Sequence, residues 1–169
     1  NIDVTVDEII EKLPKGNAPY EEDNELYGAN PEKVFIGSPY SLYAFGVFEV
    51  PIKNVANKFK SGAISKKGIE IEELQNIIKS GSPLIAWTRI DENLSKLEYV
   101  DSWIDEDTGK RIKWPSGEHA VVVYGYDDNF YYISNPENGE KYPLEKEIFE
   151  YNFELMGSRV VYYEGEIYE

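Results

Sequence analysis

The sequence of 169 residues contains no cysteine and only one histidine, His119. The lack of cysteine excludes disulfide bonds and thiolate metal sites. It fits an extracellular protein of a Gram-positive-like bacterium, in which free thiols are a liability, and it fits many cytosolic proteins as well. Imidazole is the side chain that ordinarily titrates near neutral pH. Because His119 is the single histidine in the sequence, any imidazole chemistry must use it.

Basic residues and long apolar runs are also scarce. The chain has 17 Lys and Arg against 32 Asp and Glu, which gives a net charge of −15. Nucleic-acid binding needs clustered cations, which this sequence lacks, and the same negative charge repels anionic lipid headgroups. No apolar run approaches the roughly 20 residues that span a bilayer, and no signal peptide is recognisable. We therefore expect no nucleic-acid partner and no membrane span.

The remaining composition is that of a folded protein. Hydrophobic residues make up 41% of the chain and aromatic residues 14%, which is enough apolar surface to offset the entropy cost of folding. The length suits one domain over residues 1–169. Because the chain begins with Asn1 rather than Met, we expect this domain to be incomplete at its N-terminus.

The hydrophobic pattern predicts an α+β fold, with helices concentrated early and an antiparallel sheet later. Between the first two helices, residues 17–51 form a long stretch rich in Gly, Pro and Tyr that we predict to be irregular. The predicted helices span residues 5–13, 51–60, 70–79 and 144–156, and the predicted strands span 63–65, 84–88, 99–104, 111–114, 120–126, 130–134, 141–142 and 159–163.

The most suggestive pair of polar residues is His119 and Asn135. His119 opens the run that we predict as a central strand, and Asn135 follows the next strand. A hairpin turn near Asp127 brings the two residues close to each other on adjacent strands. The Asn135 carboxamide oxygen is then able to accept the imidazole N–H, as in a Cys-His-Asn site. The alternative is a lone structural histidine with a local hydrogen bond.

Other polar and aromatic clusters point to no second site. Asp101, Asp105, Glu106 and Asp107 surround a predicted hairpin tip without the spacing of a calcium loop, so we interpret them as a solvated turn. Zinc motifs and phosphate-binding glycine loops are absent from the sequence, and we expect neither a metal nor another cofactor. The aromatic cluster around Tyr40 is more typical of core or loop packing than of a ligand platform.

Four segments together resemble the C39-like cysteine peptidases, from about Asp3 to Tyr163. This resemblance implies a papain-like cysteine proteinase fold, in which a helical half carries the nucleophile and an antiparallel sheet carries the histidine and its partner. The four segments are NPEKVFIGSPYSLYAFGVFEVPI (30–52), GSPLIAWT (81–88), EHAVVVYGYDDNFYYISNP (118–136) and FEYNFELMGSRVVYY (149–163).

The resemblance assigns roles to matching positions. His119 would be the general base, and Asn135 would orient the imidazole at a position where the family commonly has Asp. A neutral amide would stabilise the imidazolium less than a carboxylate. Trp87, Thr88 and Tyr40 are expected to contribute to substrate binding. The implied activity is that of a peptidase or amidase at the cell surface or outside the cell, with a peptide or protein substrate.

The nucleophile itself is missing. In the family, the catalytic Cys begins a helix that precedes the segment VTVDEIIEKLP, together with a Gln of the oxyanion hole. Neither residue is in this sequence, and no Ser or Thr stands at an equivalent position. We expect that helix to lie outside the 169 residues. The alternatives are a catalytically inactive peptide-binding module and a cell-surface interaction domain on the same fold.

Overall fold

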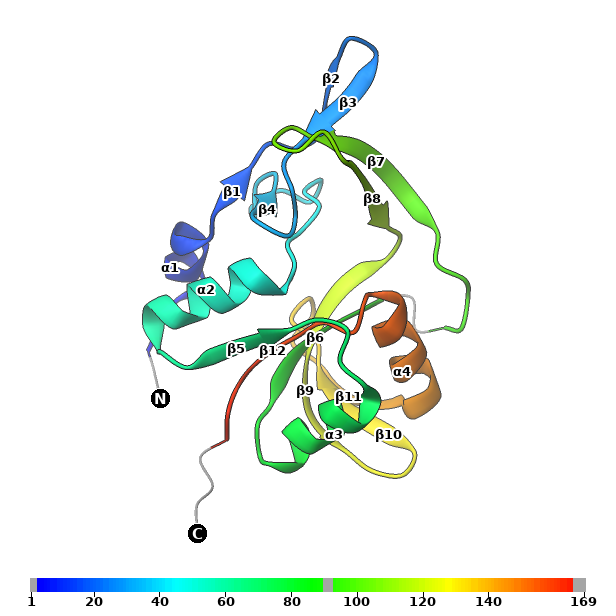
Figure 1. Cartoon of the computed structure of the whole chain (residues 1–169). Coiled ribbons are helices and arrows are strands. Elements are labelled where there is room, and N and C mark those ends of the chain that lie inside the picture. The colour runs from blue at the N-terminus through cyan, green and yellow to red at the C-terminus, as the bar shows by residue number, and fades with distance from the viewer. Residues whose placement is uncertain (1–2, 90–92, 166–169) are drawn as a thin grey trace. The chain divides into compact units, whose positions relative to one another are not determined.

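A computed structural model describes residues 3–89 and 93–165 of the chain (Figure 1). The chain divides into two compact units, each assembled from two separate stretches of sequence. The first unit comprises Asn1–Ser61 and Glu98–Pro115, and the second comprises Gly62–Leu97 and Ser116–Glu169.

The first unit combines two helices with short strands around tryptophan side chains. Strands β2, β3, β7 and β8 form a sheet in that order, in which β3 and β7 are parallel, and β1 and β4 form a separate parallel pair. Trp103 and Trp114 stack with ring centroids 6.1 Å apart in its core. The elements are α1 (Val6–Lys12), β1 (Lys15–Gly16), β2 (Tyr20–Glu22), β3 (Glu25–Gly28), β4 (Phe35–Ile36), α2 (Glu49–Phe59), β7 (Tyr99–Asp105) and β8 (Arg111–Pro115).

The second unit is a six-stranded antiparallel sheet with two helices. The strand order is β11-β10-β9-β6-β12-β5, so β9 lies between β10 and β6 as a central strand. The elements are β5 (Ala63–Lys66), α3 (Ile71–Lys79), β6 (Leu84–Arg89), β9 (Glu118–Tyr126), β10 (Phe130–Ser134), β11 (Lys141–Glu145), α4 (Lys146–Leu155) and β12 (Val160–Tyr163).

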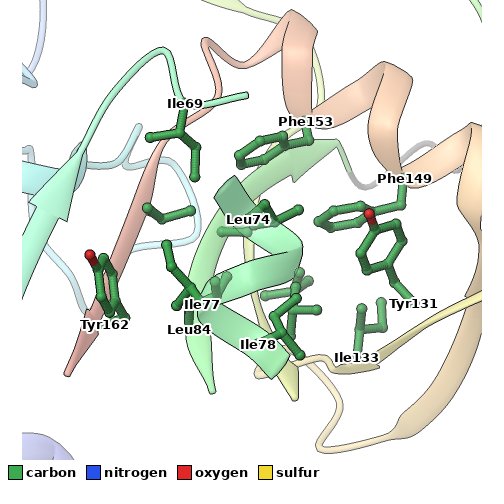
Figure 2. Packing of buried hydrophobic residues seen from close by; sticks show 14 of the residues in the cluster. Ile69, Leu74, Ile77, Ile78, Leu84, Tyr131, Ile133, Phe149, Phe153 and Tyr162 are labelled. Carbon is green, nitrogen blue, oxygen red and sulfur yellow. The ribbon is translucent and has the colours of Figure 1, made fainter. Parts of the chain in front are cut away.

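Both helices of the second unit contribute to one apolar core (Figure 2). Leu74 from α3 and Phe149 from α4 are fully buried in it. Phe149 packs against Tyr131 of β10, with the two ring centroids 4.4 Å apart, and against Phe153 one turn later on α4. This spacing of apolar residues by three and four positions places one stripe of each helix against the sheet.

The predicted α+β class is confirmed, and most predicted elements are present within one or two residues. Among the predicted elements, two need correction. Residues 17–51 are not irregular throughout, because β2 and β3 form a hairpin whose turn residues Asp23 and Asn24 have φ of 50° and 63°. The last helix begins at Lys146 rather than Leu144, since β11 continues through Glu145. The strands of the missed hairpin expose most of their side chains, so they lack the apolar alternation that predicts a strand.

The predicted solvated tip at residues 101–107 also needs correction at one position. Asp105 is buried, and its carboxylate accepts hydrogen bonds from Asn30 Nδ2 at 2.9 Å and from Thr108 Oγ1 at 2.6 Å. These bonds, with the Asp107 N–H and Lys33, outweigh burial and lower the pKa of Asp105. The carboxylate therefore organises the β7–β8 turn instead of facing solvent.

Candidate functional site

His119 and Asn135 meet on the sheet of the second unit. His119 is the second residue of β9, and Asn135 directly follows β10. Ser134 pairs with Val122 across the two strands, so Asn135 lies diagonally across from His119. The long side chain of His119 can reach a residue in that diagonal position. His119 Nε2 and Asn135 Oδ1 are 2.9 Å apart. The proximity that the hairpin pattern predicts is therefore present, and the catalytic roles stay a prediction.

The hairpin that joins these residues has its own polar anchor. The Asp127 carboxylate accepts hydrogen bonds from the backbone N–H groups of Asn129 and Phe130, both at 2.8 Å, and from the Tyr132 hydroxyl at 2.6 Å. These three bonds, with the tyrosine bond contributing most, lower the pKa of Asp127. The register between β9 and β10 shifts between Tyr132 and Ile133. The shifted register fixes which residues of the two strands lie opposite each other near His119.

The surroundings of Asn135 determine which imidazole nitrogen carries the proton. Asn135 Oδ1 also accepts the backbone N–H of Glu137 at 2.9 Å. Since an N–H donor points at it, this atom must be the amide oxygen and not the nitrogen. The oxygen can only accept, so His119 Nε2 carries the proton. In the neutral ring, Nδ1 is then the basic nitrogen and is available to a proton donor.

Thr88 lies beside the histidine on the neighbouring strand. It pairs directly with His119 between β6 and β9, and directly opposed residues of antiparallel strands project to the same face. Thr88 is 2% exposed, and its hydroxyl has no hydrogen-bond partner among the described residues. Trp87 is also 2% exposed. Such burial leaves little of either side chain for a substrate to touch, and their role in binding stays a prediction.

A second polar cluster begins at the residue next to His119. Glu118 is half-buried, pairs with Arg89 in the β6–β9 register, and interacts electrostatically with the buried Arg159. Burial raises the pKa of Glu118 to about 7, and the positive charge of Arg159 opposes this rise only in part. The sequence does not predict a role for Glu118, because nothing in the run GEH indicates that the carboxyl group is withdrawn from water.

Tyr40 belongs to the first unit. Its side chain is 70% exposed, and its hydroxyl donates to Asp7 Oδ1 on α1 at 3.2 Å. The predicted core or loop packing covered the aromatic cluster of Tyr40, Tyr43, Phe45 and Phe48. It is wrong for Tyr40 and for Tyr43, which is 94% exposed, whereas Phe45 and Phe48 do pack against Trp114. The exposed ring is accessible to a ligand.

The chemistry available to this chain is limited by its side chains. It has an oriented imidazole and no thiol. Across residues 3–89 and 93–165, no group of three or more His, Cys, Asp or Glu side chains is arranged to hold a metal ion. No helix in the same ranges is long and apolar enough to cross a membrane.

Comparison with known proteins identifies the family. The model of the Peptidase_C39 like family matches residues 1–161. This chain belongs to that family. A solved structure described as a C39-like peptidase from Bacillus anthracis superposes with a TM-score of 0.76 at 27% identity, over 96% of this chain and 80% of that one. The α+β fold with an antiparallel sheet bearing His119 is thus a C39-like peptidase fold.

A curated relative is also similar in sequence. The uncharacterized protein YvpB of Bacillus subtilis strain 168 is 25% identical over 133 residues, which is 78% of this chain and 52% of YvpB. The chain therefore spans about half the length of this curated relative.

Proposed function

We propose that this chain supplies the histidine and asparagine of a cysteine peptidase or amidase that acts on peptide substrates. The observation that carries the proposal is the 2.9 Å contact between His119 Nε2 and Asn135 Oδ1 in a chain of the C39-like peptidase family. The thiol comes from a segment outside the 169 residues. The greater length of both matched relatives supports this part of the proposal.

In this reaction His119 Nδ1 takes the proton of the thiol, and the thiolate attacks the carbonyl carbon of the peptide bond. The protonated imidazole then gives its proton to the leaving amine as the C–N bond breaks. Water, deprotonated by Nδ1, attacks the resulting thioester and releases the acid and the thiol. Throughout this cycle Asn135 holds the ring by the Nε2–H bond, which keeps Nδ1 directed at the reacting atoms.

The test uses the intact gene product rather than the 169 residues alone. Its mass is measured before and after brief treatment with iodoacetamide at pH 7. We expect a mass above 19.4 kDa with one rapidly alkylated cysteine. His119→Ala should slow this alkylation and the hydrolysis of a peptide library by about 100-fold or more, since a general base typically contributes about 10²–10⁴-fold. Asn138→Ala, which removes an exposed amide in the turn between β10 and β11, is the matched control and should change neither rate.

One observation favours a second function. Because the chain has no cysteine, the same fold without an added thiol would bind peptides without cleaving them. An intact mass of 19.4 kDa with no adduct would exclude the thiol mechanism. Saturable peptide binding by calorimetry with no hydrolysis would then support the peptide-binding module.

A further inference from the structure

We propose that an exposed loop of the first unit, residues 38–44, docks a cationic peptide segment with apolar side chains. This loop, called the Tyr40 loop below, joins β4 to α2. Three of its side chains face solvent: Tyr40 is 70% exposed, Leu42 is 99% exposed and Tyr43 is 94% exposed. Three large apolar side chains so close in sequence and so fully solvated form a contact surface rather than the scattered exposure usual for single residues.

The Tyr40 loop has a defined conformation. Its ends are joined where Phe45 N donates to Ile36 O at 3.1 Å and Ile36 N donates to Gly46 O at 2.9 Å. Ile36 is fully buried, and the Phe45 ring packs against Trp103 with centroids 5.0 Å apart. A loop held this firmly at its base loses little further freedom when a partner binds, so its apolar side chains can contribute net affinity.

Further hydrogen bonds fix the tip. Ser41 N donates to Ser38 O at 2.9 Å, and Ala44 N donates to Ser41 O at 3.3 Å. At the entrance Gly37 has φ of 91°, a conformation that favours glycine. The exposure of Leu42 and Tyr43 is therefore built into the turn.

The charge beside the loop is negative. The Tyr40 hydroxyl donates to Asp7 Oδ1 at 3.2 Å, and Glu11 lies close enough to act on Tyr40 electrostatically. Among the described residues Asp7 has no cation within 4.0 Å, whereas Glu11 is 3.9 Å from Lys12. The neighbouring Lys15 and Lys58 ammonium groups instead bind backbone carbonyls at the C-terminal end of α1. Asp7 therefore remains available to a cation on a partner.

The charge also decides between possible partners. A second copy of the chain would bring together two acidic surfaces on molecules of net charge −15, and anionic lipid or nucleic acid would be repelled in the same way. A peptide segment with Lys or Arg between Leu or aromatic residues satisfies both features, because its cations pair with the acidic groups while its apolar side chains cover Leu42 and Tyr43. Because Tyr40 is also an expected substrate-binding residue, this inference rests on the proposed function and deepens it by naming a class of cationic, apolar peptide, and binding at this surface does not require a thiol.

The experiment measures binding of a fluorescein-labelled 12-residue peptide of alternating Lys and Leu, by anisotropy, to the whole chain. We expect saturable binding that weakens as salt is raised from 0.1 M to 1 M, since the Debye length falls from about 10 Å to about 3 Å. Leu42→Ser with Tyr43→Ser should lower the affinity by about tenfold, the loss typical of central apolar contacts, without any change in net charge. Leu94→Ser, an exposed leucine of the second unit, is the control and should leave the affinity unchanged.

A second pair of variants tests the charge. The double variant Asp7→Asn with Glu11→Gln should lower the affinity by about threefold. The control is Asp128→Asn with Glu137→Gln, which removes the same charge from exposed positions of the second unit and should lower the affinity less. Circular dichroism checks that all variants are folded. Equal affinity of the wild type and the loop variant would overturn the proposal, and so would equal binding of a Glu-Leu peptide. Loop-dependent dimerisation or partition into phosphatidylcholine vesicles without peptide binding would overturn it in favour of a second copy or a lipid surface.

Discussion

Glu118, the residue before His119, makes the free energy of unfolding depend on pH, and a single substitution isolates its contribution. Glu118 has its pKa raised to about 7 from an ordinary value of 4.5, chiefly because it is withdrawn from water. Each pKa unit corresponds to about 1.4 kcal/mol. Ionising Glu118 in the folded protein therefore costs about 3.5 kcal/mol more than ionising it in the unfolded chain.

The sign follows from proton binding. Below pH 4.5 both states hold the Glu118 proton, and the carboxyl group has no effect on the pH dependence. Between 4.5 and 7 the unfolded chain releases the proton while the folded protein keeps it, so unfolding becomes easier as pH rises. Well above pH 7 both states are ionised, and the full cost of about 3.5 kcal/mol is present.

Glu118→Gln removes this titration while keeping the shape of the side chain. We expect the free energy of unfolding of the variant, relative to wild type, to rise by about 3 kcal/mol between pH 4.5 and pH 7.5. The measurement is urea unfolding followed by far-ultraviolet circular dichroism at several pH values. Taking the difference between the two proteins cancels the contribution of every other titrating group.

Glu21→Gln is the matched control, because it removes one carboxylate from an exposed position on β2. A wild-type-minus-variant difference that stays flat with pH, or that equals the difference for Glu21→Gln, would refute the reasoning. Such a result would mean that water or Arg159 stabilises the Glu118 carboxylate in the folded state.

Three further outcomes are expected. In nitrogen-15 spectra at pH 9, the single histidine should appear as the Nε2–H tautomer. Asn135→Leu should give a mixture of tautomers, because the accepting oxygen is lost. An unchanged spectrum would show that Asn135 does not set the tautomer. Thr88→Val should raise the free energy of unfolding by about 1 kcal/mol, since it removes a buried hydroxyl without a partner, and a loss of stability by urea titration would contradict this. Phe149→Ala should lower the free energy of unfolding by about 3–5 kcal/mol in the same titration. Tyr124→Ala, at a half-exposed ring, should lower it much less. Equal losses would argue against the core packing shown in Figure 2.

Local sequence signals were sufficient for most elements of the second unit. The apolar run at 84–88 predicts a buried strand and the one at 120–126 predicts a central strand, and both strands lie inside the sheet. The distance in sequence between His119 and Asn135, with turn residues between them, predicts their meeting, because a hairpin fixes which residues face one another. The family resemblance also rested on these segments and is confirmed.

The sequence by itself determined the α+β class, the histidine–asparagine pair and the absence of a thiol, because each depends on residue identity or on contacts close in sequence. Only the tertiary structure decided the state of Glu118, Thr88 and Asp105. Their burial depends on strands and loops distant in sequence, such as Arg159 beside Glu118 and Asn30 beside Asp105. The free energy of a polar group is set by the water and partners that surround it, and those are fixed only when the chain has folded.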